Sequence, residues 1–466
     1  MNTVNNYIIN TWNLTLIKNI DFNKTNVINI TGNSTLHLYL IAKDTTSCPY
    51  CGYSCYYIHS SKKQLIKHIL SNQSYAEIVF HKRIYKCNSC GYGFSDFLGD
   101  FISSRGVSIF LELAILKSMK NLSLTYKMIT SMYNISDTFV CGIFDRHVSI
   151  PPLTLPYVLC VDEIYARRLT STKYCCALFD PIENKLIDIL YSRRKDLLEP
   201  YFLRKSKEEK SVVKYFVCDL NDTYHSIAYK YFKGITVVAD CFHVIKNLSD
   251  AFRQIRIRVM KKHEEMRNET MEYWLLKKFD WMLEMSIDDV KKDYYEFRKW
   301  NMNLSKYQLL DYMMKVDETL TEAYYLKEAY RDANRSHKIN SDEDRLEIQQ
   351  KLVEFIKAFH SSSSPELRRF ATTLSNWQLE ILNSFIYIDD WRLSNAKIEN
   401  INGQIKNLMA ISYGFTNFER TRTRIIFTIN KDYPFSIIKR YESKQKNLTK
   451  KRKKCHTPLR LKPTHH

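Results

Sequence analysis

The chain has 466 residues, 45% of them hydrophobic and 26% charged, so it is long enough for about two to four globular domains and is neither collagen-like nor wholly disordered. Seventy Lys and Arg against fifty Asp and Glu leave a net charge of +20, which indicates a polyanionic partner, either nucleic acid or an anionic membrane surface. The sequence lacks the roughly 18-residue apolar run of a membrane-spanning helix and the pattern of a signal peptide, so we expect a cytoplasmic protein.

The N-terminal part contains two Cys-x-x-Cys-Gly motifs. Residues 1–45 mix Asn, Thr and Ile with weak alternation, which predicts a strand-like segment with a short hairpin. Residues 46–100 then form a predicted zinc ribbon, because each motif places two thiolates on one turn and zinc takes four such ligands. Two strands and their turn would join the motifs. The predicted zinc ligands are Cys48, Cys51, Cys87 and Cys90, and we expect Cys55, His59 and His81 to be bystanders.

Residues 103–150 change to a pattern of three helices. Asn134 to Ser136 form the turn before the last helix, with Ser136 as its N-cap. The spacing is compatible with a helix-turn-helix DNA-binding domain and equally with an ordinary three-helix bundle. In the first case Thr138, Arg146 and His147 are the candidate DNA contacts. The predicted buried side of the same helix consists of Phe139, Val140, Ile143 and Phe144.

Prolines at 151, 152 and 156 mark a linker, after which strand-like runs predominate. Residues 157–245 predict three strands, a helix, a strand, a helix and a strand. Because the first three connections are short enough for hairpins, the sheet is expected to be mixed. Residues 246–390 have helical periodicity and predict an inserted helical domain, and residues 391–438 would complete the α/β domain. Residues 439–466 carry eleven Lys and Arg against one Glu and predict a disordered basic tail.

Two aspartates end strand-like runs in the α/β part. Asp162 ends the apolar run that begins at Val158, and Asp219 ends the run that begins at Tyr215. An acid at the end of a core strand is held rigidly and still reaches solvent, which suits a metal ligand. Each aspartate alone is more often a strand-end cap. If the strands are adjacent, both carboxylates meet at one edge of the sheet.

A third acid lies on the helix that begins near Ser394. One face of this helix carries Asn395, Glu399, Asn402 and Lys406, while the opposite face is apolar. A solvated face usually carries mixed charges, so this amide-rich stripe favours a helix that presents a metal ligand and phosphate contacts. Asp240 and His243 follow another strand, and we expect them to play a supporting role.

In order and content these features resemble the DDE transposases of the ISL3 family, bacterial mobile elements. The resemblance extends from about residue 46 to 430. Its most specific parts are the Asp240-Cys241-Phe242-His243 run and the closing block of Asn402, Lys406, Gly414, Phe415 and Arg424. The family usually has an Asn-Gly pair before the glutamate helix, where this chain has Asn395-Ala396.

The resemblance implies a ribonuclease-H-like catalytic domain with a helical insertion between the second aspartate and the glutamate. Asp162, Asp219 and Glu399 would be the catalytic triad and would hold two Mg²⁺ (or Mn²⁺) ions for phosphoryl transfer. It also implies that the zinc ribbon and the helix-turn-helix recognise the terminal inverted repeats of the element. A homodimer or larger assembly on DNA, associated with the nucleoid, is expected because two DNA ends must be joined.

Three alternatives remain at this stage. The chain could be a domesticated DNA-binding regulator that keeps the zinc and helical modules without catalysis, or a metal-dependent nuclease that cuts without strand transfer. A polybasic membrane-associated protein is the weakest alternative, since the basic tail has no lipidation motif or amphipathic anchor beside it.

Overall fold

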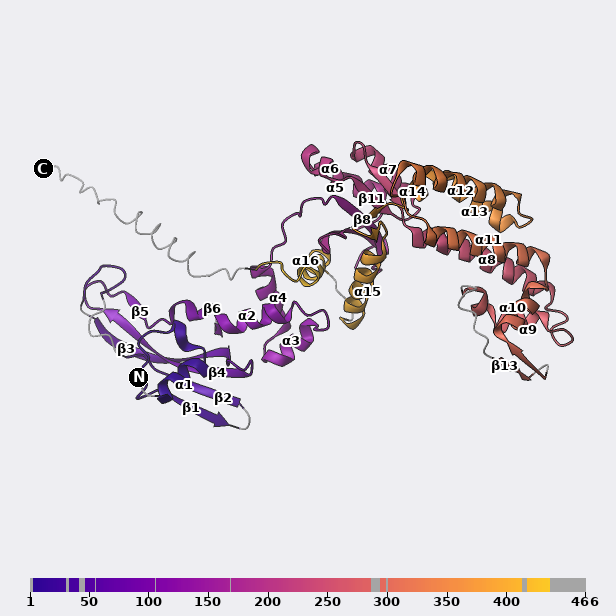
Figure 1. The fold of residues 1–466 in the computed structure, drawn as a ribbon. Helices are drawn as coiled ribbons and strands as arrows, with labels where there is room; N and C mark the ends of the chain where they lie inside the picture. Colours follow the sequence, from indigo (N-terminus) through magenta and orange to yellow (C-terminus); the bar gives the residue numbers. More distant parts are fainter. Residues whose placement is uncertain are drawn as a thin grey trace. The chain divides into compact units, whose positions relative to one another are not determined.

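The computed structural model describes residues 3–30, 33–41, 47–54, 56–104, 106–167, 169–285, 294–298, 301–412 and 417–435. The predicted basic tail, Cys55, Gly414 and Phe415 lie outside these residues. The chain forms two compact units (Figure 1). Unit 1 comprises residues 1–151 and 407–466, and unit 2 comprises residues 152–406, so the second boundary falls within one long helix.

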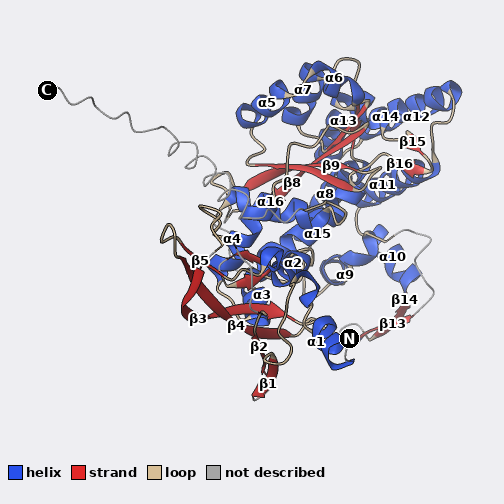
Figure 2. Ribbon diagram, turned by 90° about the vertical axis from the view of Figure 1, so that its left-hand side faces the viewer, coloured by secondary structure: helices blue, strands red, loops and turns tan. Residues whose placement is uncertain are grey.

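Unit 1 is built on a seven-stranded sheet with the order β1-β2-β4-β3-β7-β6, and β5 also pairs with β4. Two long antiparallel strands, β3 and β4, dominate it (Figure 2). Their alternation buries Ile66, Ile78 and Phe80 on one face against Trp12 and Leu36. The elements are α1 (Thr3–Thr11), η1 (Leu14–Leu16), β1 (Asn26–Ile30), β2 (Asn33–Leu38), β3 (Tyr56–Ile69), β4 (Tyr75–Cys87), β5 (Gly93–Ser95), η2 (Gly99–Phe101), β6 (Ile102–Ser104) and β7 (Val107–Ser108).

The N-terminal segment contains the expected hairpin, formed by the antiparallel strands β1 and β2. The helix α1 that precedes it was not predicted. Because β2 also pairs with β4, the segment 1–45 and the cysteine-containing segment share one sheet and one core.

Three helices follow in unit 1: α2 (Ile109–Ser118), α3 (Tyr126–Tyr133) and α4 (Asp137–His147). The N-cap side chains of Ser108, Thr125 and Ser136 each accept a hydrogen bond from the N–H three residues later, so each helix begins at a capping residue. On α4, Val140, Ile143 and Phe144 are buried as predicted, and Phe139 is partly buried.

A C-terminal helix, α16 (Phe418–Ile429), joins the core of these three helices through Phe427. Arg424 is buried and donates to the main-chain carbonyls of Met119, Asn121 and Leu124, just after α2 ends. Residues 391–438 were expected to complete the catalytic domain. In the structure α16 belongs to unit 1, because its apolar face and Arg424 complete that core.

Unit 2 contains a five-stranded sheet with the order β10-β9-β8-β11-β12. Strands β8, β9 and β10 pair antiparallel, and β11 lies parallel to both β8 and β12, so the sheet is mixed as predicted. The elements are β8 (Val158–Tyr165), β9 (Tyr174–Asp180), β10 (Lys185–Leu190), α5 (Lys195–Arg204), α6 (Lys207–Val212), β11 (Tyr215–Cys218), α7 (Asp222–Tyr231) and β12 (Thr236–Ala239).

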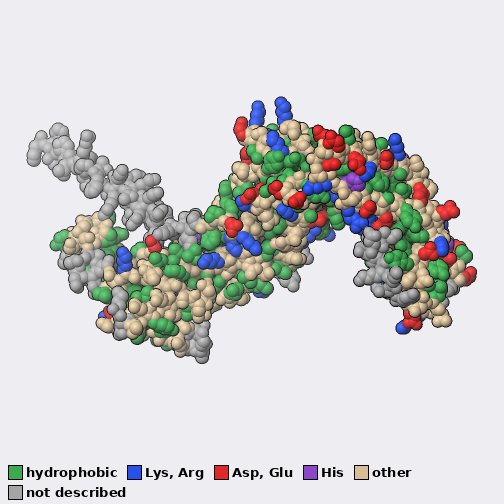
Figure 3. Space-filling view, viewed as in Figure 1, with side chains coloured by type: hydrophobic (Ala, Val, Ile, Leu, Met, Phe, Trp, Pro, Cys, Tyr) green, Lys and Arg blue, Asp and Glu red, His purple; other side chains and the backbone are tan. Residues whose placement is uncertain are grey.

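The expected helical insertion follows β12 and has one apolar core that runs from α8 to α14. Acidic and basic side chains are interspersed on the face of this region that Figure 3 shows. Two short hairpins, β13–β14 and β15–β16, were not predicted. The elements are α8 (Cys241–Lys262), α9 (Glu272–Lys278), η3 (Asp280–Leu283), β13 (Tyr294–Phe297), β14 (Met302–Ser305), α10 (Lys306–Met314), α11 (Glu318–Ser336), α12 (Asp342–Ser361), α13 (Pro365–Asn376), α14 (Gln378–Asn383), β15 (Tyr387–Ile388) and β16 (Trp391–Arg392).

The last helix of unit 2, α15 (Ala396–Ile411), carries the third predicted acid. Its apolar face is buried as the periodicity predicts, through Ile398, Ile401, Ile405 and Leu408. Within the described residues, no helix combines the length and the apolar character needed to cross a bilayer.

Candidate catalytic and metal-binding sites

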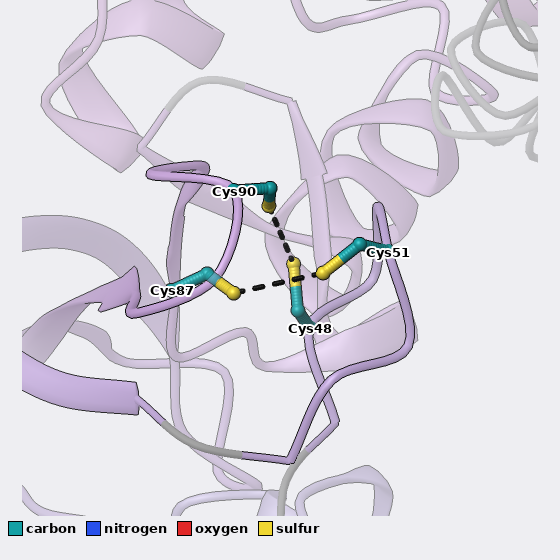
Figure 4. A group of neighbouring side chains, drawn as sticks. All are labelled: Cys48, Cys51, Cys87 and Cys90. Atoms are coloured by element: carbon teal, nitrogen blue, oxygen red, sulfur yellow. Dashed lines mark hydrogen bonds between the residues drawn. The ribbon is translucent and has the colours of Figure 1, made fainter.

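The four predicted zinc ligands converge in unit 1 (Figure 4). Cys48 and Cys51 lie in the turn before β3, and Cys87 and Cys90 lie in the turn that ends β4. The sulfurs of Cys48 and Cys90 are 3.7 Å apart and those of Cys51 and Cys87 are 3.6 Å apart. A zinc ion with Zn–S bonds of about 2.3 Å requires sulfurs about 3.8 Å apart at the corners of a tetrahedron. The four thiols therefore fit a structural zinc ion.

The two cysteine turns have the same backbone geometry. The N–H of Gly52 bonds the carbonyl of Cys48, and the N–H of Gly91 bonds that of Cys87. Both glycines have positive φ, 76° and 68°, which a residue with a Cβ adopts only with strain. The N–H of Cys90 lowers the pKa of the Cys87 thiol, which favours the thiolate that binds metal. His81 contacts His37 and stacks on Tyr39 instead of joining the cysteines.

In unit 2 the two predicted aspartates come from adjacent strands, since β8 and β11 pair in parallel. Asp219 follows β11 as expected, whereas Asp162 lies within β8, because pairing with β9 continues that strand to Tyr165. Burial raises the pKa of Asp162, although the N–H of Glu163 and the amide of Asn402 oppose the rise. Burial, followed by the charge of Asp162, raises the pKa of Asp219 to about 7. A buried carboxyl whose ionisation a neighbouring carboxylate disfavours is typical of a site that is completed by a cation.

Asp240 lies at the end of β12, next to β11, and caps α8. It is 0% exposed and its two oxygens already have protein donors. Oδ1 accepts from the N–H of Asn395 at 2.8 Å, and Oδ2 accepts from the N–H of His243 at 3.2 Å and lies 2.8 Å from its Nδ1. Through these hydrogen bonds Asp240 connects the end of β12, the first turn of α8 and the start of α15.

His243 lies between two aspartates. Its Nδ1 is 3.0 Å from Oδ1 of Asp219 and 2.8 Å from Oδ2 of Asp240. Burial alone would lower its pKa, but the hydrogen bond to Asp240 and the charge of Asp219 outweigh that effect and raise it. These three residues form one of the groups in the described part of the chain that could hold a metal ion.

Helix α15 joins the two aspartates through its amide side chains. Asn395 donates its Nδ2 to Oδ1 of Asp219 at 3.2 Å and to the carbonyl of Val161 at 3.1 Å. Asn402 donates its Nδ2 to Oδ2 of Asp162 at 2.6 Å. Two of the predicted stripe residues therefore contact the two predicted aspartates, which brings the helix of Glu399 to the same edge of the sheet.

Glu399 lies one turn after Asn395 on α15 and is partly exposed. Burial raises its pKa, and the charges of Asp240 and Asp162 add to the rise while those of His243 and Lys246 oppose it. Lys246, one turn after His243 on α8, was not predicted, although its i+3 spacing from His243 places it on the same side of that helix. Lys406, the last stripe residue, is exposed.

The chemistry of the donors fits a hard divalent cation. Oδ1 of Asn395 and Oδ1 of Asn402 are buried without a hydrogen-bond partner among the described residues. Unpartnered buried amide oxygens beside carboxylates that repel one another provide the oxygen-rich environment that Mg²⁺ and Mn²⁺ bind.

The predicted DNA contacts on α4 divide into two groups. Thr138 is exposed as expected. His147 was expected at the solvent-facing surface but is 4% exposed, and its Nε2 lies 2.9 Å from Oε2 of Glu112, which is itself buried on α2. Arg146 also bonds Glu112, at 3.1 Å. Both side chains contact the buried carboxylate of Glu112, so His147 serves the packing of α4 on α2.

Comparison with known protein families decides the identity. A family model for ISL3-type DDE transposases, described as a transposase, matches residues 159–425, which is more than half of the chain. The chain belongs to the ISL3 family of DDE transposases. A second model, the zinc-finger of transposase IS204/IS1001/IS1096/IS1165, matches residues 44–90 and includes all four cysteines. No curated protein matches the chain.

Membership of this family makes the protein an enzyme of DNA cleavage and strand transfer, and therefore a DNA-binding protein. The zinc-finger match and the sulfur geometry agree on a four-cysteine zinc region in unit 1. The transposase match spans the five-stranded sheet, the helical insertion, α15 and part of α16, so unit 2 contains the mixed α/β catalytic region.

Proposed function

We propose that this transposase binds the terminal inverted repeats of its insertion sequence and cleaves and joins DNA with Asp162, Asp219 and Glu399 as the catalytic carboxylates. The observation that carries this proposal is the pair of contacts from one helix, Asn395 to Asp219 and Asn402 to Asp162, which flank Glu399. They support a single site in which acids from β8, β11 and α15 face one phosphate.

The catalytic region is proposed to have a ribonuclease-H-like fold. Three antiparallel strands followed by two parallel strands, with the first strand in the centre of the sheet, support it. Because β8 and β11 are parallel neighbours and Cys160 pairs with Val217, Asp162 and Asp219 lie side by side two residues further along.

The residues of the chain would share the work as follows. Asp162, Asp219 and Glu399 hold divalent cations, which when bound supply charge stabilisation at the scissile phosphate. Asn402 and Asn395 fix the orientation of the two aspartates. Asp240 fixes Asn395 through its N–H, and Lys406 offers an exposed positive charge for DNA phosphate on the same helix. We propose Asp219 rather than Asp240 as the second ligand because the side chain of Asp240 is 0% exposed, whereas that of Asp219 is 19% exposed and can meet a substrate.

Recognition of the DNA ends is assigned to unit 1. The capped helices α3 and α4, separated by Asn134 in the left-handed conformation, are proposed as a helix-turn-helix with Thr138 on its DNA-facing side. Arg146 is offered as a phosphate contact only, since Glu112 shares its charge. The protein is proposed to act as a dimer or larger assembly, because strand transfer joins two ends of one element.

The test uses linear DNA that carries the element's own ends, with Mg²⁺ or Mn²⁺. Wild type should cleave and join these ends, while Glu399→Gln, which keeps the shape but removes a charge, should bind equally well and lose cleavage by at least about 1000-fold. Glu183→Gln removes an exposed acid of unit 2 from the turn between β9 and β10 and should act as wild type. Binding without cleavage by the wild type, with metal and both ends supplied, would instead support a DNA-binding regulator.

A further inference from the structure

An exposed phenylalanine lies at the edge of the carboxylate cluster. Phe242 is the second residue of α8, between Asp240 and His243, and it is 55% exposed. Its neighbours Val244 and Ile245 join the core of the helical insertion, whereas Phe242 belongs to no apolar cluster of the described residues. The packing of unit 2 therefore gives no reason for an aromatic ring at this position.

The chemistry of the other exposed aromatic residues sharpens this point. Among the described side chains of unit 2, Phe242 is the exposed phenylalanine, while the remaining exposed aromatic residues are tyrosines and one tryptophan, which carry a polar group for water. A ligand that covers this ring would remove apolar surface from water, which favours binding.

The position of the ring is fixed relative to the catalytic acids. The rings of Phe242 and His243 meet edge to face with their centroids 5.8 Å apart, and Nδ1 of His243 lies 3.0 Å from Asp219. Lys246, four residues after Phe242 and thus on the same side of α8, is exposed and within electrostatic reach of Glu399. An apolar ring and a cation lie together beside the place where a phosphate would be cut.

We propose that Phe242 stacks on a nucleobase next to the scissile phosphate, unstacked from the DNA duplex, while Lys246 contacts an adjacent phosphate. This inference deepens the proposed function and rests on it. A base lies one sugar away from its phosphate, every base has an apolar face that stacks on an aromatic ring, and enzymes that act within a duplex often destack it. Phe242 would thus position the strand for cleavage without touching the reacting atoms.

The test compares the full-length wild type with Phe242→Ala on two DNA ends, one fully paired and one mismatched at the nucleotides that flank the cleavage point. On paired ends Phe242→Ala should cleave about 10-fold more slowly, because base–aromatic stacking is worth roughly 5- to 100-fold per base. On mismatched ends, where unstacking is already done, the difference should shrink to about twofold. Phe242→Trp should retain wild-type cleavage on both ends.

Equilibrium binding provides a readout that does not depend on cleavage. Wild type should bind mismatched ends more tightly than paired ends, and Phe242→Ala should lose this preference while its zinc content and thermal unfolding stay unchanged. Leu203→Ala is the control, since Leu203 is an apolar residue on α5 of the same unit and is 69% exposed, against 55% for Phe242. Failure of the wild type to cleave either end would refute the proposed catalysis, and the binding preference would still judge the role of Phe242.

Two results would overturn the inference. One is cleavage and binding by Phe242→Ala at wild-type levels on both DNA ends. The other is an equal loss on paired and mismatched ends, which would mean that Phe242 supports the fold of the site rather than an unstacked base.

Discussion

The cysteine cluster of unit 1 and the carboxylate cluster of unit 2 differ in the kind of ligand atom and in whether the site is closed or open. The four sulfurs come from two identical turns, lie at tetrahedral distances and leave no position for a substrate. The acids come from two strands and a distant helix. Burial and then neighbouring carboxylates raise the pKa values of Asp219 and Glu399, and Glu399 stays partly exposed. A closed set of soft ligands stabilises a fold, whereas an open set of hard ligands that repel one another is suited to binding a cation together with a substrate phosphate.

The largest expected effect concerns the zinc site of unit 1. Cys87→Ser removes one of four zinc ligands and should release the metal and unfold the region around β3 and β4, since structural zinc in small domains contributes on the order of 10 kcal/mol. Zinc content per chain, thermal unfolding and binding to the DNA ends measure this.

Cys141→Ser is the control for the zinc prediction, because Cys141 is a half-buried thiol on α4 outside the cluster. It should keep one zinc per chain. A metal-free protein that unfolds at the same temperature as the metal-bound protein would contradict a structural role for zinc.

A smaller effect separates two aspartates of the carboxylate cluster. Asp219→Ala should abolish cleavage, with a loss of at least about 1000-fold, whereas Asp240→Ala should retain part of it. The stabilities should show the opposite order. Asp240→Ala removes the cap of α8 and the partner of the Asn395 N–H, at a cost of about 1–3 kcal/mol, whereas Asp219→Ala relieves repulsion. Cleavage rates and chemical unfolding of both variants measure this, and the reverse order of activities would reassign the second ligand to Asp240.

The smallest effect concerns the pH dependence of unit 1. His68 is buried on β3, and burial lowers its pKa from the ordinary 6.5 to about 4. Its neutral ring satisfies both nitrogens, since Nε2–H donates to the carbonyl of Trp12 and Nδ1 accepts from the hydroxyl of Ser108, each at 2.7 Å. Below pH 6.5 the imidazole of His68 binds a proton in the unfolded chain but stays neutral in the folded chain. The free energy of unfolding should therefore fall by about 3 kcal/mol between pH 6.5 and 4.

Comparing the wild type with His68→Gln separates this contribution from the release of zinc by acid, because zinc release should affect the two proteins equally. The variant should be less stable at pH 7.5 and should show a flatter loss of stability between pH 6.5 and 4.5 in chemical unfolding. Parallel curves for the two proteins would show that His68 does not titrate between these limits.

Prediction from sequence succeeded where the signal is local. The Cys-x-x-Cys-Gly turns, the Ser136 cap and the strand that ends just before Asp219 depend on neighbours along the chain, and the structure contains each of them. The expected strand end at Asp162 was wrong, because pairing with β9 continues β8 to Tyr165. The polar stripe of α15 was visible for the same reason, because a helix repeats its face every three to four residues.

The errors and omissions concern partners far apart in the chain. His147 is buried because Glu112, 35 residues earlier, occupies the facing helix, and no local pattern indicates that pair. The affiliation of α16 with unit 1 depends on Arg424 reaching carbonyls about 300 positions earlier. The polar stripe of α15 was predicted, but its hydrogen-bond partners were not. The contacts of Asn395 with Asp219 and of Asn402 with Asp162 depend on the fold.

The position of α16 in unit 1 also bears on the order of events during synthesis. Phe427 is part of the core that α2, α3 and α4 share, and Arg424 caps the end of α2. Because a ribosome makes the chain from its N-terminus, residues 152–406 emerge before this core can close. The core around the helices proposed to recognise the DNA ends would therefore be completed last, after the catalytic unit. A chain released before α16 is made would contain the carboxylate cluster but an incomplete DNA-recognition core.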